Sequence, residues 1–170
     1  MAGRDEEFRE FFDAEFRPLR RLAYLLTGDW GEAEDLAQET MVRMYRAWSR
    51  IQDRERPAAY ARTVLVNRHR SLLRRARVET KHAVARHPDI ATPAIEMGED
   101  ALVVWRALHE LPVRERQVLV LRFYEDMPIA EIAEVLGIPI GTVKSLTHRA
   151  VGRLRERLGD TFGKVVLIDE

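Results

Sequence analysis

The 170-residue sequence contains no cysteine, which excludes disulfide bonds, a thiol sensor and a cysteine-ligated zinc site. No run of apolar residues is long enough to span a bilayer, so we expect no membrane insertion. The first residues, MAGRDEEFREFF, contain no cationic segment followed by an apolar one, and this pattern is not that of a secretory signal. These absences together predict a cytoplasmic protein.

The sequence also lacks the patterns that catalysis or metal binding would need. Its five histidines are scattered, and His82 and His87 have no third ligand at helical spacing. It has no serine in a nucleophile turn with histidine and aspartate in the order of a catalytic triad. It also has no glycine-rich loop that would bind phosphate. We therefore expect no enzyme, no metal ion, no cofactor and no small-molecule ligand.

Basic and acidic side chains balance at 28 each, but they are unevenly distributed along the chain. Residues 41–90 hold 13 basic and 4 acidic side chains, and residues 139–158 hold 5 and 1. Residues 1–40 hold 5 basic and 11 acidic ones, and residues 91–138 are acidic too. A protein that coats nucleic acid would be basic throughout, whereas this alternation suggests two DNA-facing patches and two acidic surfaces for other contacts.

The segment 127–158 has the pattern of a helix-turn-helix. Apolar residues recur at spacings of three and four between 129 and 136, which predicts a short amphipathic helix. Gly137 can end this helix in a left-handed conformation, and Pro139 suits the first turn of the next helix. Two helices joined by so short a turn must cross steeply.

The second helix of this motif divides into two faces at about 100° per residue. The inner positions are Val143, Leu146, Ala150, Leu154 and Leu158. The outer positions are Lys144, Ser145, His148, Arg149, Gly152 and Arg155. A cationic face with hydrogen-bonding groups near the helix N-terminus is typical of a helix that reads the major groove. The alternative is an ordinary surface helix with solvated charges.

The N-terminal part predicts three helices. The first spans residues 4–26, with Pro18 expected to bend or split it, and Asp29 is a candidate N-cap for the second. The second carries one continuous inner stripe formed by Ala33, Leu36, Ala37, Thr40, Met41, Met44, Tyr45, Trp48 and Ile51. On its outer face the acidic residues come first and the arginines last. In one interpretation the acidic end contacts a basic protein surface and the arginines contact phosphates. In the other, the face is solvated and the order of charges only matches the helix dipole.

The third helix is expected from Pro57 to about Val78. Its inner positions are Tyr60, Ala61, Val64, Leu65, Leu72 and Leu73, and its basic face is formed by Arg62, Arg68, His69, Arg70, Arg74, Arg75 and Arg77. Asn67 is a neutral hydrogen-bonding group among these cations, of the type that reads a base edge, or else an ordinary solvated side chain. Trp48 and Tyr60 either stack on unpaired bases or belong to the core.

The pattern as a whole predicts an all-α fold with two small helical domains joined by a flexible linker, the second of which contains the helix-turn-helix. The first domain covers residues 1–78. Residues 79–98 lose the helical periodicity and contain two prolines and a glycine, which is typical of a linker. Helical periodicity resumes in the second domain, residues 99–160, and a tail at 161–170 follows. We expect Val113 and Phe123 among the buried residues ahead of the helix-turn-helix.

Three blocks carry a family resemblance: AEDLAQET at 33–40, the basic helix around Asn67, and LPVRERQVLVLRFYEDMPIAEIAEVLGIPIGTVKS at 111–145. In this order and separation they resemble the extracytoplasmic-function sigma factors, the small two-domain members of the bacterial sigma-70 family. The resemblance covers about residues 8–158. It implies a subunit that directs core RNA polymerase to a set of promoters and initiates transcription. It also implies control by an anti-sigma factor.

The resemblance also implies roles for individual residues. Three residues match the region 2 segment that docks on the coiled coil of the largest polymerase subunit: Asp35, Gln38 and Glu39. Six match the segment that captures and opens the minus-10 element of promoter DNA: Arg62, Asn67, Arg68, Arg70, Arg74 and Arg75. Five match the region 4 helix that enters the major groove of the minus-35 element: Thr142, Lys144, Ser145, His148 and Arg149.

One departure from the family pattern lies in the helix-turn-helix. The family commonly has an arginine after the KS dipeptide, where this chain has Leu146, so one DNA contact is missing. A different reading of the same motif is a dimeric operator-binding regulator, which needs only the C-terminal half. That reading predicts tight DNA binding without polymerase and leaves the AEDLAQET block without a role.

Overall fold

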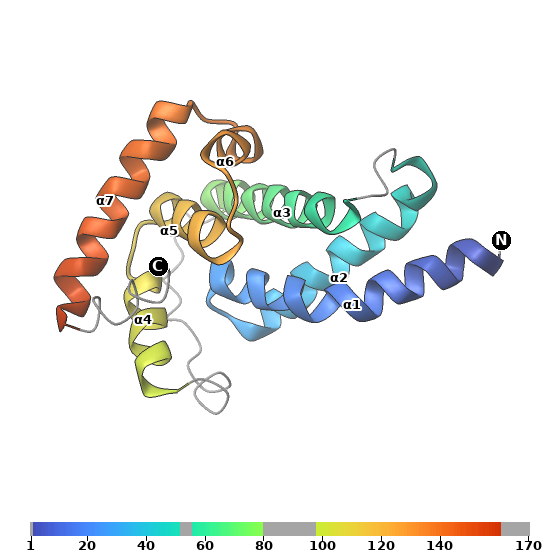
Figure 1. Cartoon of the computed structure of the whole chain (residues 1–170), viewed down its shortest axis with the longest axis horizontal. Helices are drawn as coiled ribbons and strands as arrows, with labels where there is room; N and C mark the ends of the chain where they lie inside the picture. Colours follow the sequence, from blue (N-terminus) through green and yellow to red (C-terminus); the bar gives the residue numbers. More distant parts are fainter. Residues whose placement is uncertain (1, 52–55, 80–97, 161–170) are drawn as a thin grey trace. The chain divides into compact units, whose positions relative to one another are not determined.

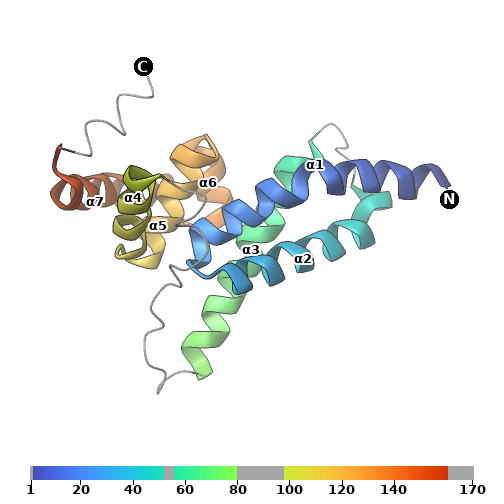
Figure 2. The same cartoon turned by 90° about the horizontal axis from the view of Figure 1, so that it is seen from below.

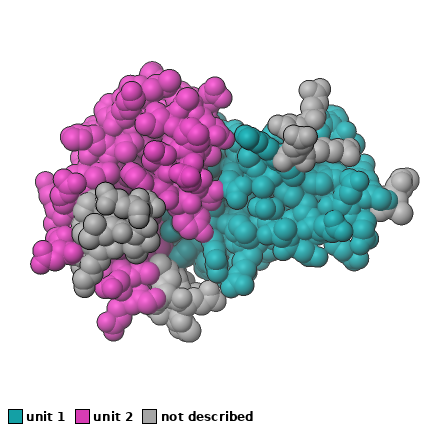
Figure 3. All heavy atoms as spheres, viewed as in Figure 1, with its two compact units in different colours: residues 1–87 teal, residues 88–170 magenta. Residues whose placement is uncertain are grey.

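The computed structural model describes residues 2–51, 56–79 and 98–160, and these residues are helical apart from short turns (Figure 1). The chain divides into two compact units, residues 1–87 and 88–170 (Figure 3). The predicted all-α class is therefore confirmed. Apart from Glu79 and Gly98, the predicted linker lies outside the described residues, as do the tail 161–170 and both His82 and His87.

Unit 1 contains α1 (Ala2–Thr27), α2 (Trp30–Ala47), a short 3-10 helix η1 (Trp48–Arg50) and α3 (Pro57–Glu79). Helices α1 and α2 lie side by side in opposite directions (Figures 1 and 2), and α3 packs against both. Their core consists of large apolar side chains from all three helices, namely Leu19, Leu22, Leu26, Leu36, Met44, Leu65 and Val66. Burial of these side chains is the main favourable contribution to the stability of the unit.

The turn between α1 and α2 follows from two residues. Gly28 has a φ of 76°, a left-handed conformation that glycine adopts without steric cost. Asp29 is the N-cap of α2, and its carboxylate accepts a hydrogen bond from the Glu32 backbone N–H at 2.8 Å. The predicted N-cap is therefore confirmed, and it fixes the point at which the acidic face of α2 begins.

Two burial expectations for unit 1 were wrong, and of the two effects expected of Pro18 the split does not occur. Helix α1 continues without interruption through Pro18, so the proline does not split it. Tyr45, Tyr60 and Leu72 were expected inside but are exposed, because the rotation of α2 and α3 carries these positions past the edge of the buried stripe. His69 was expected on the basic face but is only 4% exposed, because it lies on the same side of α3 as Leu65.

Unit 2 contains α4 (Glu99–His109), α5 (Val113–Leu119), a π-helical segment η3 (Val120–Tyr124), α6 (Ile129–Leu136) and α7 (Ile140–Leu158). Helix α7 packs against α4, α5 and α6. The fully buried side chains include Trp105, Val118, Leu121 and Ile132. Gly137 ends α6 with a φ of 63°, and Pro139 is the N-cap of α7, so the predicted turn of the helix-turn-helix is confirmed.

The segment ahead of the helix-turn-helix differs from the expectation. Val113 and Phe123 are exposed, whereas the polar residues Glu115, Arg116 and Gln117 are buried. Glu115 and Arg116 lie before the π-helical turn and are buried next to polar partners, Glu115 beside Arg153 of α7 and Arg116 donating to the His109 carbonyl. Phe123 lies within the π-helical turn, in which the Glu125 N–H donates to the Val120 carbonyl five residues earlier. This wider turn shifts which side chains face the core, and an ideal helical periodicity does not anticipate it. Within the described ranges, no helix is long and apolar enough to cross a membrane.

Candidate functional site

The acidic face of α2 carries the three residues expected to bind polymerase, and all three lie outside its buried stripe. Asp35 and Gln38 are exposed, and Glu39 is partly exposed. The Gln38 side-chain amide donates to Glu34 at 3.4 Å, and Glu34 forms an ion pair with Arg20 of α1 at 3.0 Å. The structure thus groups the three residues on one surface, but their side chains differ in how far they are held by neighbours.

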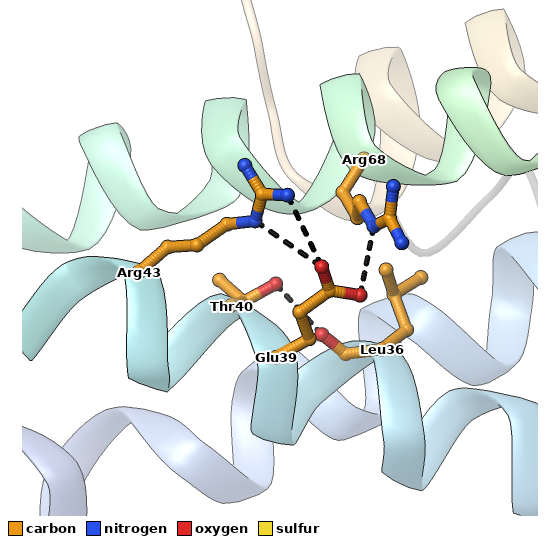
Figure 4. A network of polar contacts seen from close by, with 5 residues as sticks. All are labelled: Leu36, Glu39, Thr40, Arg43 and Arg68. Carbon is orange, nitrogen blue, oxygen red and sulfur yellow. Dashed lines mark hydrogen bonds and ion pairs between the residues drawn. The ribbon is translucent and has the colours of Figure 1, made fainter.

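Glu39 is the most strongly held of the three (Figure 4). Its Oε2 accepts a hydrogen bond from Nε of Arg68 on α3 at 2.7 Å. Its Oε1 accepts two hydrogen bonds from the Arg43 guanidinium, at 3.1 and 3.3 Å. Partial burial acts to raise the pKa of Glu39, but the hydrogen bonds and charges of Arg68 and Arg43 outweigh it and hold this pKa below its ordinary value.

The basic face of α3 is divided by its surroundings. Asn67, Arg74 and Arg75 are exposed, whereas Arg62 and Arg70 are partly buried. Guanidinium groups that face solvent can reach phosphates, and the Asn67 amide can both donate to and accept from a base edge. The structure therefore exposes half of the six residues expected to meet the minus-10 element.

The other half of that set is engaged within unit 1 to differing degrees. The Arg62 guanidinium lies 3.8 Å from the Glu15 carboxylate on α1, and Arg68 is paired with Glu39. The side chain of Arg68 is only 15% exposed. The Arg68 guanidinium connects α3 to α2, and its expected contact with DNA stays a prediction.

The two aromatic residues that were considered for base stacking, Trp48 and Tyr60, differ in burial. Trp48 is buried among Phe8 and Phe11, with ring centroids 5.2 and 4.9 Å away, so it belongs to the core. Tyr60 is exposed, seven residues before Asn67 and hence on nearly the same side of α3. The exposed Tyr60 ring, about two turns from Asn67 on α3, is a feature that the sequence periodicity missed, because the periodicity placed Tyr60 inside.

The outer face of α7 presents four exposed side chains and one partly buried one: Lys144, Ser145, His148 and Arg149 are exposed, and Thr142 is partly buried. The opposite face packs inward through Val143, Leu146 and Ala150. The hydroxyl of Ser145 donates to the Gly141 carbonyl at 2.7 Å, which leaves its lone pairs available to a donor on a base. All five residues therefore lie on one helix, on the side away from the core of unit 2.

Leu146 lies on the buried edge of α7, as its helical angle predicts, and is 6% exposed. It therefore contributes to packing and not to the exposed outer face of α7. Within the described part of the chain, no three histidine, aspartate or glutamate side chains gather in a way that could hold a metal ion.

Comparison with known proteins connects these surfaces to a family. The family model for sigma-70 region 2 matches residues 11–79, and that for sigma-70 region 4 matches residues 107–156. The chain is 35% identical to the ECF RNA polymerase sigma factor SigL of Mycobacterium tuberculosis, over 86% of this chain and 86% of that protein. The chain belongs to the extracytoplasmic-function sigma factors of the sigma-70 family.

Other similar proteins support the same family membership. The chain is 35% identical to the RNA polymerase sigma-E factor of Streptomyces coelicolor, over 89% of this chain and 86% of that relative. Among solved structures, it resembles the sigma factor RpoE in the co-crystal structure with the anti-sigma factor NepR from Bartonella quintana. That match has a TM-score of 0.71 and 26% identity, and it covers 90% of this chain and 97% of the other. Region 2 thus contains α2 and α3, and region 4 contains the helix-turn-helix.

Proposed function

We propose that this sigma factor directs core RNA polymerase to a specific set of promoters through three surfaces. The acidic face of α2, with Asp35, Gln38 and Glu39, binds core polymerase. The basic face of α3 captures the minus-10 element, and the outer face of α7 reads the minus-35 element. The observation that carries this proposal is the division of α7 into a buried apolar face and a face of exposed cationic and hydrogen-bonding side chains.

Readout of the minus-35 element needs groups that reach base edges and groups that hold phosphates. Ser145 and Arg149 lie one helical turn apart, and Lys144 and His148 form a parallel pair beside them. The Arg149 guanidinium can contact a guanine through two hydrogen bonds, and Lys144 can neutralise a phosphate as a point charge. Thr142, near the start of α7, adds a hydroxyl at the end of the helix that enters the groove.

Promoter opening needs a different chemistry. Separation of the two strands costs stacking energy, which capture of unpaired bases on a basic surface can offset. Exposed Asn67 supplies an amide for base recognition, and Arg74 and Arg75 supply charge for the sugar-phosphate backbone. The chain needs no catalytic group for this step, because the polymerase performs the chemistry of RNA synthesis.

Each DNA-binding surface is small, with about one helix of base contacts, and a single mismatched base pair costs only about 1–3 kcal/mol. Attachment of both surfaces to one polymerase makes the second contact effectively intramolecular. Two weak readers then act as one selective reader. This is the physical reason that the α2 surface is needed for DNA specificity, although it touches no DNA.

An anti-sigma factor is the second partner in this proposal. The solved sigma factor structure that resembles this chain was determined in complex with an anti-sigma factor. A protein that covers the α2 surface would keep the sigma factor from polymerase, and its release would start transcription of the promoter set. Since DNA, polymerase and this regulator all meet in one place, the proposed site of action is the cytoplasm.

A reconstituted transcription assay tests the proposal. Promoters are first located by mapping transcription starts after overproduction of the chain. One such promoter is then transcribed with purified core polymerase, with and without the sigma factor. The proposal expects promoter-dependent RNA only when the sigma factor is present, and loss of that RNA when either promoter element is scrambled. Absence of promoter-dependent RNA with core polymerase on every mapped template would refute it.

A further inference from the structure

We infer that Glu39 and Arg68 are positioning residues, whose ion pair fixes the minus-10-reading helix α3 against the polymerase-binding helix α2. This inference rests on the proposed function and deepens it. It moves Glu39 out of the set of direct polymerase contacts and Arg68 out of the set of direct DNA contacts. Both residues then act through their neighbours, Asp35 on α2 and Asn67 on α3.

The position of Arg68 favours contact with α2 over contact with phosphate. Its Nε lies 2.7 Å from the Glu39 carboxylate, and its side chain is 15% exposed. A phosphate that pulled the Arg68 guanidinium away from α2 would leave Glu39 without one of its two cationic partners. Arg74 and Arg75 carry the same charge and face solvent, so phosphate contact does not require Arg68.

Arg68 is well placed to control the direction of Asn67. The two residues are consecutive on α3, so their side chains point about 100° apart around the helix axis. When Arg68 is anchored to α2, the rotation of α3 about its axis is restricted, and the direction of the exposed Asn67 amide is set with it. Base recognition by hydrogen bonds depends on such placement, because these bonds weaken steeply when the angle is poor.

Glu39 has its acceptor groups occupied in the same way. Oε2 accepts from Arg68, and Oε1 accepts from Arg43. Asp35, one turn earlier on α2, is exposed, and its carboxylate makes no hydrogen bond or ion pair with the described residues. The carboxylate that is ready to meet a basic polymerase surface is therefore that of Asp35, whereas that of Glu39 connects two helices of unit 1.

The test compares four single variants in holoenzyme, assembled from core polymerase and the full chain. They are Asp35→Asn, Glu39→Gln, Arg68→Gln and Arg43→Gln. Arg43→Gln is the matched control, because Arg43 binds the same carboxylate but lies on α2 itself and is 51% exposed. Arg68→Lys, which keeps the charge, is a second variant in case Arg68→Gln unfolds. Thermal unfolding and helical circular dichroism verify that each variant is folded.

Three quantities are measured: the Kd for core polymerase, the rate of promoter opening at saturating polymerase, and the ratio of opening rates on the cognate and a mutated minus-10 element. Asp35→Asn should raise the Kd about tenfold or more, and Glu39→Gln should change it less than about twofold. Glu39→Gln and Arg68→Gln should each slow opening about tenfold and reduce the minus-10 ratio. A variant that combines Glu39→Gln with Arg68→Gln should be no slower than the slower of the two single variants. Arg43→Gln should be close to wild type.

Two results would overturn the inference while leaving the proposed function in place. One is that Glu39→Gln raises the polymerase Kd as much as Asp35→Asn does, which would make Glu39 a direct contact. The other is that the Glu39→Gln and Arg68→Gln effects add in full, with Arg68→Gln also lowering the slope of log affinity against log salt by about one, as loss of a phosphate contact does. Failure of the wild-type chain to open any mapped promoter would instead refute the proposed function.

Discussion

The Nε atom of Arg153, on α7, lies 3.5 Å from Oε2 of Glu115, a carboxylate buried in α5. The contact is an ion pair without hydrogen-bond geometry, since Oε2 of Glu115 has no hydrogen-bond partner. It joins α7, the second helix of the helix-turn-helix, to α5. A buried carboxylate is costly unless a cation accompanies it, so the orientation of α7 and the charge of Glu115 depend on one another.

Removal of Arg153 should therefore destabilise region 4. We expect Arg153→Ala to lower the free energy of unfolding by about 1–2 kcal/mol, a value reduced because the arginine is about half exposed. Denaturant unfolding measures the change in free energy, and hydrogen exchange shows whether α7 loses protection. Lys144→Ala is the control, because Lys144 is exposed on the same helix and should affect DNA binding but not stability. Equal stability of the two variants would contradict the role of the pair.

The turn of the helix-turn-helix offers a second test. Gly137 has a φ of 63°, so Gly137→Ala should cost about 1 kcal/mol or more of stability, because a Cβ is disfavoured in this conformation. Gly152 lies within α7 with open space at its Cβ position, so Gly152→Ala should instead gain up to about 1 kcal/mol. Thermal unfolding of both variants decides this. The same sign of change in both would show that backbone conformation is not what Gly137 supplies.

The pH dependence of stability should report on His109. Burial, with a smaller contribution from the positive charge of Arg116, lowers the pKa of His109 to about 3. In the unfolded chain this pKa is about 6.5, so the unfolded state binds more protons between the two values. The stabilising contribution is therefore complete above about pH 6.5 and is lost as the pH falls toward 3.

The wild-type chain should lose about 1–2 kcal/mol of stability from this group between pH 7 and pH 5. His109→Gln should be less stable at pH 7, because the ring packs against Trp105 with centroids 4.4 Å apart, but its stability should fall less over that range. Unfolding curves at several pH values measure the difference in slope. Parallel slopes for the two proteins would contradict the burial of a neutral His109.

The departure at Leu146 predicts a packing effect. Leu146 is buried, so Leu146→Ala should cost about 2–3 kcal/mol of stability. Leu146→Arg, which restores the residue common in the family, should also destabilise region 4 and should not increase affinity for the minus-35 element. Stability and minus-35 binding in holoenzyme are measured side by side. Higher DNA affinity at unchanged stability would mean that the position faces the groove in this chain as well.

The fold was predictable wherever local rules determine it. Asp29 marks the start of α2 because its carboxylate can cap the helix, and Gly137 marks the turn because few other residues adopt its conformation. The inner face of α7 followed from a periodicity of 3.6 residues, which placed Leu146 correctly on the buried edge. Each of these features depends on residues that are near one another in sequence.

The rest depended on contacts that sequence order does not reveal. Glu39 and Arg68 are 29 residues apart, so their pairing follows only from how α2 and α3 pack. The π-helical turn at Val120–Tyr124 changes the helical repeat around Phe123, which is exposed, and Glu115 is buried where α5 packs against α7 and Arg153. His69 was misassigned for a related reason: an amphipathic pattern gives the side that is apolar but not how far the core extends around it.

The central claim is that two modest DNA-binding surfaces become selective only when polymerase holds both. Its most direct test is the ratio of affinities for a mapped promoter and for scrambled DNA, measured at one salt concentration with the free chain and with holoenzyme. We predict a ratio below about tenfold for the free chain and of at least about a thousandfold for holoenzyme. A free chain that already shows the full ratio, with a symmetric footprint on DNA, would contradict this account and favour a dimeric operator-binding regulator.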